Sequence, residues 1–249
     1  MVLDKLDTEI LNEIQWKFPL VKEPFHEIAK KFQISPDEVK NILNKLKRNG
    51  VLRQLSAIFD TRKLGYTSSL VAMEILPDKL EEVAYYINKH PGVSHNYERE
   101  HQFNLWFTLA VPPGSDLKNE LNKFSKLDGI KKVRMLPTLQ LFKIGVKLDM
   151  MDAKKHDIKP SEEKKKIKNI EFIPTEEDKE FIRHLQKDLE IIDRPFLKAS
   201  QSLGITEDKI FEKLNYYESI GVMRRFAAIL RHREAGFTAN GMIVWKVPE

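Results

Sequence analysis

The sequence predicts an α+β protein built by tandem duplication. Each copy starts with a winged helix-turn-helix, and a ferredoxin-like (βαββαβ) domain completes the first copy. Three observations support this fold class. The 249-residue chain contains a gap-free internal repeat, each copy opens with three amphipathic helical patterns, and strand and helix patterns alternate after Gly65.

The repeat is visible without any gap. An offset of 171 residues places Asp7 over Asp178 and continues to Pro77 over Pro248. Identical pairs include Pro24/Pro195, Phe25/Phe196, Leu43/Leu214, Gly50/Gly221, Arg53/Arg224 and Gly65/Gly236. Positions that differ in the helical patterns stay apolar, as at Ile10 and Phe181. A match of this length indicates a duplication.

The helix-turn-helix prediction depends on capping signals. Asp4 is a candidate N-cap for the first helix, and the second helix follows Pro24. The third helix begins at Ser35-Pro36, a serine cap with proline at the first helical position, and ends at the C-cap signal Asn49-Gly50. A strand pattern follows over residues 51–59. Three helices followed by a strand pair are typical of a winged helix-turn-helix.

A ferredoxin-like domain is predicted next. Strand patterns cover residues 70–76, 93–99, 105–111 and 133–146, and helix patterns cover residues 78–89 and 116–127. This order is β-α-β-β-α-β. Trp106 and Phe107 are neighbours on one strand and must point to opposite faces, so one is expected in the core and the other in a pocket or an interface.

The resulting organisation has five segments. We expect a winged helix-turn-helix at 1–65, a ferredoxin-like domain at 66–148, a charged linker at 149–172, a second winged helix-turn-helix at 173–239 and the first strand of a second ferredoxin-like domain at 240–249. Because the repeat stops at Glu249, the counterpart of Asp78, the second ferredoxin-like domain is expected to be cut short. Two alternatives follow: either the sequence is a truncated form of the protein, or another chain completes the pocket.

Composition excludes several classes of site. The chain has no cysteine, which excludes disulfides, thiolate zinc sites, cysteine-ligated iron–sulfur clusters and a cysteine nucleophile. No apolar run approaches the length of a membrane span, and the N-terminus lacks a signal-peptide core, so we expect a soluble, cytoplasmic protein with no membrane partner. The net charge of +5 combines 42 basic and 37 acidic side chains, which is weak support for a nucleic-acid partner.

The third helix of each copy argues against DNA readout. In copy one it carries Lys40, Lys45, Lys47 and Arg48, which could attract phosphate. The aligned helix of copy two carries Glu207, Asp208, Glu212 and Glu218, which would be repelled by the duplex. Two tandem DNA readers should behave alike, and these do not. We therefore expect that the protein does not bind DNA.

The most unusual segment is the polar strand around residues 94–102. Alternation places His95, Tyr97, Arg99 and, if the strand continues, His101 on one face. Arginine binds carboxylates and histidine titrates near neutral pH, so this set is suited to anion recognition and proton transfer. The alternative is an exposed hairpin with a solvated polar face. No second group stands at helical ligand spacing, so a zinc site is not expected, and the other histidines, including His90, are expected at the surface.

The chain resembles a known superfamily. A winged helix followed by a ferredoxin-like domain, with Leu3-Asp4-Lys5-Leu6-Asp7-x-x-Ile10-Leu11 at the start, is similar to the Lrp/AsnC regulators. Two further stretches look like those of siroheme decarboxylases, which belong to the same superfamily. They are His95-Asn96-Tyr97-Glu98-Arg99-Glu100-His101-x-Phe103-Asn104-Leu105-Trp106 and Leu136-Pro137-Thr138-x-x-x-Phe142-Lys143-Ile144-Gly145-Val146. The regulators have a glycine-centred hairpin in place of the first motif.

This resemblance implies an enzyme and its substrate. A siroheme decarboxylase would remove two acetate carboxyl groups from siroheme to give didecarboxysiroheme for haem or haem d1, with no organic cofactor and no metal beyond the substrate iron. The expected assembly is a homodimer through the ferredoxin-like sheets, with the helix-turn-helix retained as a scaffold. Two other functions remain open: a Lrp/AsnC-type transcription regulator that senses a small ligand, and a non-catalytic scaffold of the haem pathway.

The resemblance also implies residue roles. Arg99 would bind a substrate carboxylate, and Tyr97 or a histidine would protonate the methylene carbon. His95 or His101 could instead be an axial ligand of the substrate iron, and the sequence does not separate these roles. Substrate binding is expected to involve Asn104, Trp106 and Lys143, together with Arg53 and Arg224 from the two wings, for which a structural salt bridge is equally expected.

Overall fold

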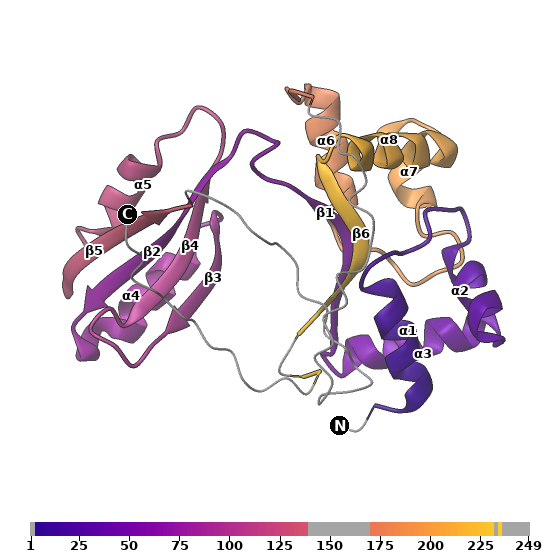
Figure 1. Cartoon of the computed structure of the whole chain (residues 1–249), viewed down its shortest axis with the longest axis horizontal. Coiled ribbons are helices and arrows are strands. Elements are labelled where there is room, and N and C mark those ends of the chain that lie inside the picture. Colours follow the sequence, from indigo (N-terminus) through magenta and orange to yellow (C-terminus); the bar gives the residue numbers. More distant parts are fainter. Residues whose placement is uncertain (1–2, 139–169, 232–233, 236–249) are drawn as a thin grey trace, which may run out of the picture. The chain divides into compact units, whose positions relative to one another are not determined.

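The computed structural model describes residues 3–138, 170–231 and 234–235. The chain forms two compact units, one containing both helix-turn-helix copies and the other containing a four-stranded sheet (Figure 1). The predicted strand at 240–249 and most of the predicted linker lie outside the described residues, so these boundaries stay predictions. No helix among the described residues is long and apolar enough to cross a membrane.

The first helix-turn-helix copy has the helices and caps that the sequence predicts. It consists of α1 (Lys5–Ile14), α2 (Pro24–Phe32) and α3 (Pro36–Arg48). The Asp4 carboxylate accepts a hydrogen bond from the Asp7 N–H at 2.8 Å, and Ser35 Oγ accepts one from the Glu38 N–H at 3.1 Å. Both contacts satisfy amide groups that have no partner within the first helical turn.

The second copy repeats this arrangement with different caps. It consists of α6 (Glu176–Leu185), α7 (Leu197–Leu203) and α8 (Glu207–Ser219). Thr175 and Asp178 form a reciprocal capping box at the start of α6. At the end of α7, Gly204 adopts a left-handed conformation with φ of 65°, where the first copy places Gln33 with φ of 55°. The glycine adopts this conformation at no steric cost.

The strand pair that follows the third helix is formed between the copies. Strand β1 (Leu52–Phe59) pairs antiparallel with β6 (Met223–Leu230), and the ends of the register are Leu52 opposite Leu230 and Phe59 opposite Met223. The register is self-complementary, since Leu52 and Phe59 are the repeat counterparts of Met223 and Leu230. Equivalent strands carry the same alternation, so an antiparallel pair buries the apolar side chains of both.

The two copies share one hydrophobic core. The ring of Phe226 in β6 lies 5.6 Å from Phe18 of copy one and 5.5 Å from Phe196 of copy two, measured between centroids. Backbone bonds reinforce the contact, with the Phe18 N–H donating to the Phe226 carbonyl at 3.0 Å and the Leu189 N–H donating to the Leu55 carbonyl at 2.8 Å. The duplicated copies therefore fold as one unit rather than as two independent modules.

The sheet unit has the strand order β3-β4-β2-β5. Its elements are β2 (Thr67–Ile75), a short 3-10 turn, α4 (Leu80–Asn88), β3 (Val93–Glu98), β4 (Leu105–Val111), α5 (Leu117–Phe124) and β5 (Ile130–Pro137). This is the predicted β-α-β-β-α-β order. The polar strand ends at Glu98, shorter than predicted. The last strand begins at Ile130, earlier than predicted, and residues from 139 onward lie outside the described part of the chain.

Helices α4 and α5 pack on one face of this sheet. Their apolar side chains form a core with the strands, which includes Val83, Ile87, Leu121 and Phe124 from the helices and Val71, Met73, Leu105, Phe107 and Leu109 from the strands. Phe107 is 1% exposed and lies 6.0 Å from Phe124, so it is the core member of the Trp106–Phe107 pair. We call the opposite side of the sheet, which α4 and α5 do not cover, the outer face.

Candidate functional site

The outer face brings residues from all four strands into adjacent rows. The register places Tyr97 opposite Trp106, Trp106 opposite Ala72 and Ala72 opposite Arg134. The next row contains His95, Thr108, Leu70 and Leu136. Side chains of one row share a face, because alternate residues of a strand point the same way. The site is therefore an aromatic and cationic surface with a small residue, Ala72, at its centre.

A local irregularity places the polar residues of β3 on this face. The register shifts by one residue between Val93 and His95, which leaves Ser94 as an extra residue. Asn96 points to the helix side, where its Nδ2 donates to Asn88 Oδ1 of α4 at 3.0 Å. His95 and Tyr97 therefore both lie on the outer face. An edge strand tolerates this polarity, because only one of its sides pairs with another strand.

His95, Tyr97 and Arg99 are stacked along the strand. The His95 and Tyr97 rings are nearly parallel, at 10°, with centroids 6.2 Å apart, and the Arg99 guanidinium carbon lies 4.8 Å from the Tyr97 centroid. Arg99 Nη1 donates to the Glu98 carbonyl at 3.0 Å, whereas its Nε is buried without a hydrogen-bond partner among the described residues. This guanidinium has donors to spare for an anion that the described chain does not provide.

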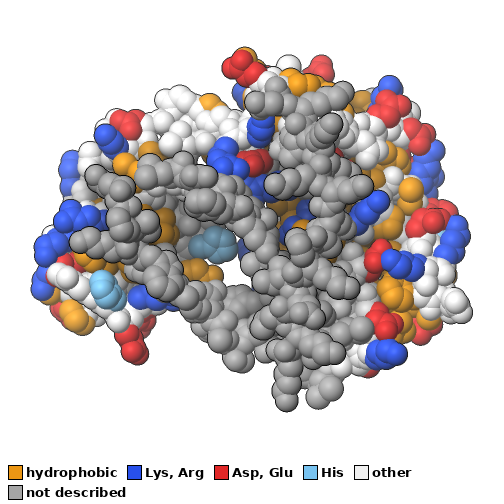
Figure 2. All heavy atoms as spheres, viewed as in Figure 1, with side chains coloured by type: hydrophobic (Ala, Val, Ile, Leu, Met, Phe, Trp, Pro, Cys, Tyr) orange, Lys and Arg blue, Asp and Glu red, His pale blue; other side chains and the backbone are white. Residues whose placement is uncertain are grey.

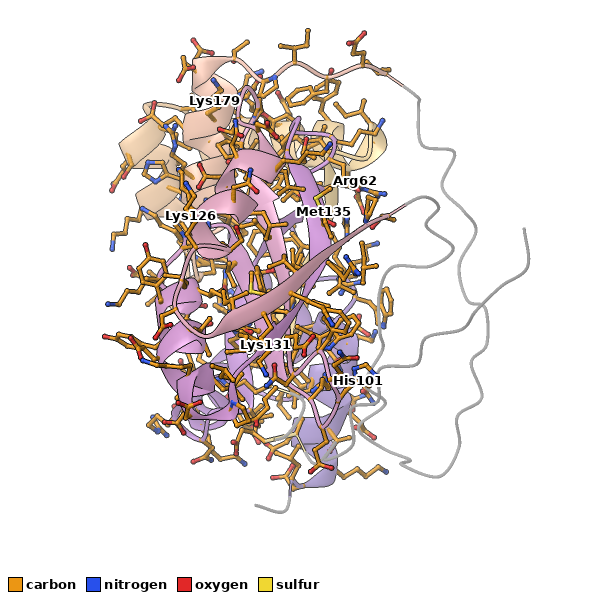
Figure 3. All side chains as sticks on the ribbon, turned by 90° about the vertical axis from the view of Figure 1, so that its left-hand side faces the viewer. Arg62, His101, Lys126, Lys131, Met135 and Lys179 are labelled. Atoms are coloured by element: carbon orange, nitrogen blue, oxygen red, sulfur yellow. The ribbon has the colours of Figure 1, made fainter. Side chains whose placement is uncertain are left out.

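His101 lies in the hairpin loop and not on the strand face (Figure 3). The condition under which it would share a face with His95 and Tyr97, a strand that continues to residue 101, is therefore not met. The Arg99 N–H donates to the Asn104 carbonyl at 2.9 Å and closes the loop. Within it, the His101 N–H donates to the Arg99 carbonyl at 2.9 Å, and the Phe103 N–H donates to His101 Nδ1 at 3.1 Å. These local hydrogen bonds give the backbone N–H groups of Arg99, His101 and Phe103 acceptors within the loop, which an extended strand at a free sheet edge would not provide for all of them.

Asn104 and Trp106 fasten this loop to the sheet. Asn104 Oδ1 accepts from the Ile75 N–H at 2.9 Å, and its Nδ2 donates to the Ile75 carbonyl at 2.8 Å. Trp106 Nε1 donates to the Phe103 carbonyl at 2.7 Å, while its ring lies partly exposed on the outer face. The polar atoms of both side chains are engaged in positioning the loop. Their contact with substrate stays a prediction, and for Trp106 it would use the ring.

Two further predicted site residues, Arg53 and Arg224, belong to the helix-turn-helix unit. Arg224 forms an ion pair with Asp60, 3.1 Å between Nη2 and Oδ2, which fits the structural alternative. Arg53 is exposed at its strand, in the same unit as Arg224, and no ion pair of Arg53 is found within the described residues. Lys143 lies outside the described residues. The structure thus gathers His95, Tyr97, Arg99 and Trp106 on one face, with His101 in the adjoining loop.

Arg134 is a candidate that sequence reasoning missed. Its position in the register puts it on the outer face, across Ala72 from Trp106, and it is exposed with no ion pair to any described residue. A single arginine in a strand with several basic residues gives no signal of its own. Only the pairing of β5 with β2 places it beside the predicted residues. No group of three histidine, aspartate or glutamate side chains within the described ranges could hold a metal ion.

The three lysines of α3 are paired with carboxylates inside the helix-turn-helix unit. Lys40 lies 2.8 Å from Asp37 and 2.5 Å from Asp193, Lys45 lies 2.7 Å from Asp7, and Lys47 lies 2.5 Å from Asp188. Hydrogen bonds to these carboxylates raise the pKa of Lys40 and of Lys45. Figure 2 shows acidic and basic side chains intermixed over the visible face of this unit. Within the described residues, the lysines of α3 therefore do not form the uncompensated basic stripe of a DNA reader.

Comparisons with known proteins define the class first. Residues 63–143 match the AsnC-like ligand binding domain, and residues 7–53 and 178–224 match the siroheme decarboxylase NirDL-like HTH domain. The solved AsnC of E. coli aligns with a TM-score of 0.50 at 20% identity over 59% of this chain, which supports the fold alone. The chain thus combines an AsnC-like domain with two copies of a NirDL-like helix-turn-helix domain.

More similar proteins identify the family. The siroheme decarboxylase of Hydrogenobacter thermophilus is 42% identical over 97% of this chain and 71% of its own length. The siroheme decarboxylase NirDL subunit of Paracoccus denitrificans is 26% identical over 100% of this chain and 74% of its own length. The chain belongs to the siroheme decarboxylase family.

A solved relative has a bound tetrapyrrole. The crystal structure of the siroheme decarboxylase NirDL in complex with an iron-uroporphyrin III analogue aligns with a TM-score of 0.70 at 35% identity. The alignment covers 91% of this chain and 66% of the solved chain. This chain therefore spans about two thirds of that structure.

Proposed function

We propose that this protein is a siroheme decarboxylase that removes two acetate carboxyl groups from siroheme to give didecarboxysiroheme. The observation that carries the proposal is the stacked set of His95, Tyr97 and Arg99 on the outer face, where Arg99 has buried donor capacity and no acidic partner among the described residues. Family membership supports the same substrate class. A substrate with many carboxylates would supply the missing anions.

The reaction requires a cationic group that binds the carboxylate and a group that donates a proton to the methylene carbon. In each decarboxylation the bond between the methylene carbon and the carboxyl carbon breaks, CO2 leaves, and the electron pair remains on the methylene carbon and the macrocycle. Protonation of that carbon gives a methyl group, so the reaction is redox-neutral. Tyr97 and His95 are the side chains on the outer face that can move such a proton, and Arg99 would orient the carboxylate before it leaves.

The outer face is suited to a flat ligand. Ala72, which is 1% exposed, lies between Trp106 and Arg134 in the register, and the partly exposed Trp106 ring offers a surface on which a planar macrocycle can stack. Arg134 on the opposite side of Ala72 would meet a second peripheral carboxylate. Asn104 would act as a positioning residue through its two bonds to Ile75.

We also propose the finer features of this activity. The iron belongs to the substrate, and the chain uses no organic cofactor, since a redox-neutral step needs only the groups above. The product would enter haem or haem d1 synthesis. Two chains would associate through their ferredoxin-like sheets. The regulator alternative is disfavoured because Lys40, Lys45 and Lys47 are paired with carboxylates and are not available to phosphate.

An anaerobic assay tests the proposal. The full-length chain is incubated with siroheme, and products are followed by absorbance and by mass loss of two CO2 groups. We expect Arg99→Ala to lower kcat/KM by about 100-fold, since a hydrogen bond to a charged group is worth about 1.5–3 kcal/mol. Arg48→Ala, an exposed arginine of the helix-turn-helix unit, serves as the matched control and should leave turnover unchanged. Wild-type chain that binds DNA specifically and leaves siroheme intact would overturn the assignment.

A further inference from the structure

The hairpin loop fixes the orientation of the His101 imidazole. The Phe103 N–H donates to His101 Nδ1 at 3.1 Å. A backbone amide can only donate, so Nδ1 must be the acceptor, and a neutral His101 ring carries its proton on Nε2. The ring also lies nearly parallel to Phe103, at 19°, with centroids 6.3 Å apart. His101 therefore presents an N–H group, not a lone pair, at its free nitrogen.

The same arrangement, a histidine Nδ1 that accepts from the backbone N–H two residues later, occurs a second time in this unit. There the Nε2 of the histidine also has an acidic partner. At the end of α4, the Gly92 N–H donates to His90 Nδ1 at 3.0 Å, again from the residue two positions later. His90 Nε2 then faces a carboxylate, with 3.7 Å between it and Glu120 Oε2. This ring is not the surface residue that the sequence suggested, because it packs edge-on against Phe124 at 5.5 Å. His90 provides an internal example of a histidine whose Nε2 serves an anion.

His101 has the first half of this motif and lacks the second. Its side chain is exposed, and none of the described residues forms a hydrogen bond or an ion pair with its Nε2. Arg99, which precedes His101 in the loop, likewise has an unpartnered Nε among the described residues. Two donors in one short loop thus lack an acceptor. A ligand carboxylate would satisfy the exposed His101 Nε2, as Glu120 does for His90 Nε2.

His95 differs from His101 in its contacts. Among the described residues, its ring makes a stacking contact with Tyr97 and no hydrogen bond that would fix a tautomer. Either ring nitrogen of His95 can therefore carry a lone pair or a proton. The two histidines, which the sequence left interchangeable, have different capacities in the structure.

We propose that His101 is a fixed hydrogen-bond donor that binds a carboxylate of the tetrapyrrole through Nε2, and that it is neither the ligand of the substrate iron nor the proton donor. Those two roles fall to His95 and Tyr97 on the outer face. This assignment rests on the proposed function. It predicts that a neutral amide with a donor at the same reach can replace His101, because glutamine donates from Nε2 without titrating.

The test compares His101→Gln with His101→Ala in the full-length chain. Turnover of siroheme is measured, and iron uroporphyrin III is the binding probe, followed through its Soret band. We expect His101→Ala to lower kcat/KM and probe affinity about 10- to 150-fold, the value of one hydrogen bond to a charged group. By the same reasoning, His101→Gln should keep kcat/KM and probe affinity at least about 10-fold above those of His101→Ala. The Soret maximum of the bound probe should be the same in all three proteins.

Controls separate this role from folding and from the proposed function. His90→Gln changes a histidine of the same motif on the helix side and should leave turnover unchanged, and thermal melts verify that each variant is folded. Equal losses in His101→Gln and His101→Ala would overturn the proposal, as would a shifted Soret band in either variant. If wild-type chain binds the probe without converting siroheme, the proposed function fails, and the affinities of the two variants still decide the role of His101.

Discussion

The helix-turn-helix unit and the sheet unit differ in how their charged side chains are satisfied. In the first unit, Lys45 and Lys47 each contact a carboxylate, and Arg224 contacts Asp60. On the outer face of the second, Arg99 and Arg134 form no ion pair with any described residue. Charges that are neutralised internally stabilise a scaffold, whereas Arg99 and Arg134 keep donors that a ligand carboxylate can use under the proposed function.

Asp178 illustrates the internally satisfied kind of charge. Burial raises the pKa of its carboxyl, but hydrogen bonds from Lys213, Tyr217 and Thr175 outweigh burial and lower the pKa to about 2. The Tyr217 hydroxyl donates to Asp178 at 2.6 Å, and burial together with this carboxylate raises the pKa of Tyr217. This cluster ties α6 to α8. The role of this cluster is to hold the two helices together.

The largest expected effect comes from breaking the core that the two copies share. Phe226→Ala removes a ring, 3% exposed, that contacts Phe18 and Phe196, and should lower the free energy of unfolding by about 3–5 kcal/mol. Chemical denaturation measures the loss, and amide hydrogen exchange locates it. Protection should fall in α1, α7 and the β1–β6 pair. Phe107→Ala, the matched change in the core of the sheet unit, should instead reduce protection in β2 and β4. A loss below about 1 kcal/mol for Phe226→Ala would contradict a shared core.

A smaller effect is expected at Asp178, with a defined pH dependence. A carboxyl whose pKa is about 2 when folded and 3.8 ordinarily stabilises the fold fully above about pH 4, and this stabilisation disappears as the pH falls through about 2. Asp178→Asn should therefore lower the free energy of unfolding by about 2 kcal/mol at pH 7. Denaturant melts from pH 7 to pH 2 should show the difference shrinking. Glu81→Gln, an exposed carboxyl on α4, is the control, and a pH-independent difference at Asp178 would refute this account.

The smallest expected effect concerns a partly exposed ion pair between the copies. Lys47 Nζ lies 2.5 Å from Asp188 Oδ2, with side chains 32% and 36% exposed. Lys47→Glu should lower the free energy of unfolding by about 0.5–1 kcal/mol, and adding Asp188→Lys should restore part of it. The recovery is partial because Asp188 Oδ1 also accepts from the Leu55 N–H at 3.0 Å. A double-mutant cycle from thermal melts measures the coupling. Strictly additive losses would mean that the pair does not hold the copies together.

Much of the fold could be predicted, because local signals and tertiary structure agree. Asp4 and Ser35 cap their helices as expected, and the β-α-β-β-α-β order is confirmed. The pairing of β1 with β6 could not be read from either strand, since each carries the same alternation and would suit several partners. The length of β3 was overestimated because the loop bonds of Arg99, His101 and Asn104 replace ladder bonds, and composition alone does not reveal this.

The candidate site was predicted only in part, for a similar reason. Period-two alternation placed His95 and Tyr97 on one face correctly, and it separated Trp106 from Phe107. Arg134 was missed, since it joins that face only through the pairing of β5 with β2. Asn104 was expected at the substrate, and the structure engages both of its polar atoms with Ile75.

The sequence by itself determined the duplication, the helices with their caps, the order of helices and strands along the chain, and the residue types of the site. These follow from periodicity and capping, which act within a few residues along the chain. Tertiary structure alone decided which strand pairs with which, that Lys40, Lys45 and Lys47 are neutralised, and that His101 carries its proton on Nε2. Ion pairs and strand pairs join residues far apart in the chain, and the bond that sets the His101 tautomer needs a loop geometry that composition does not specify.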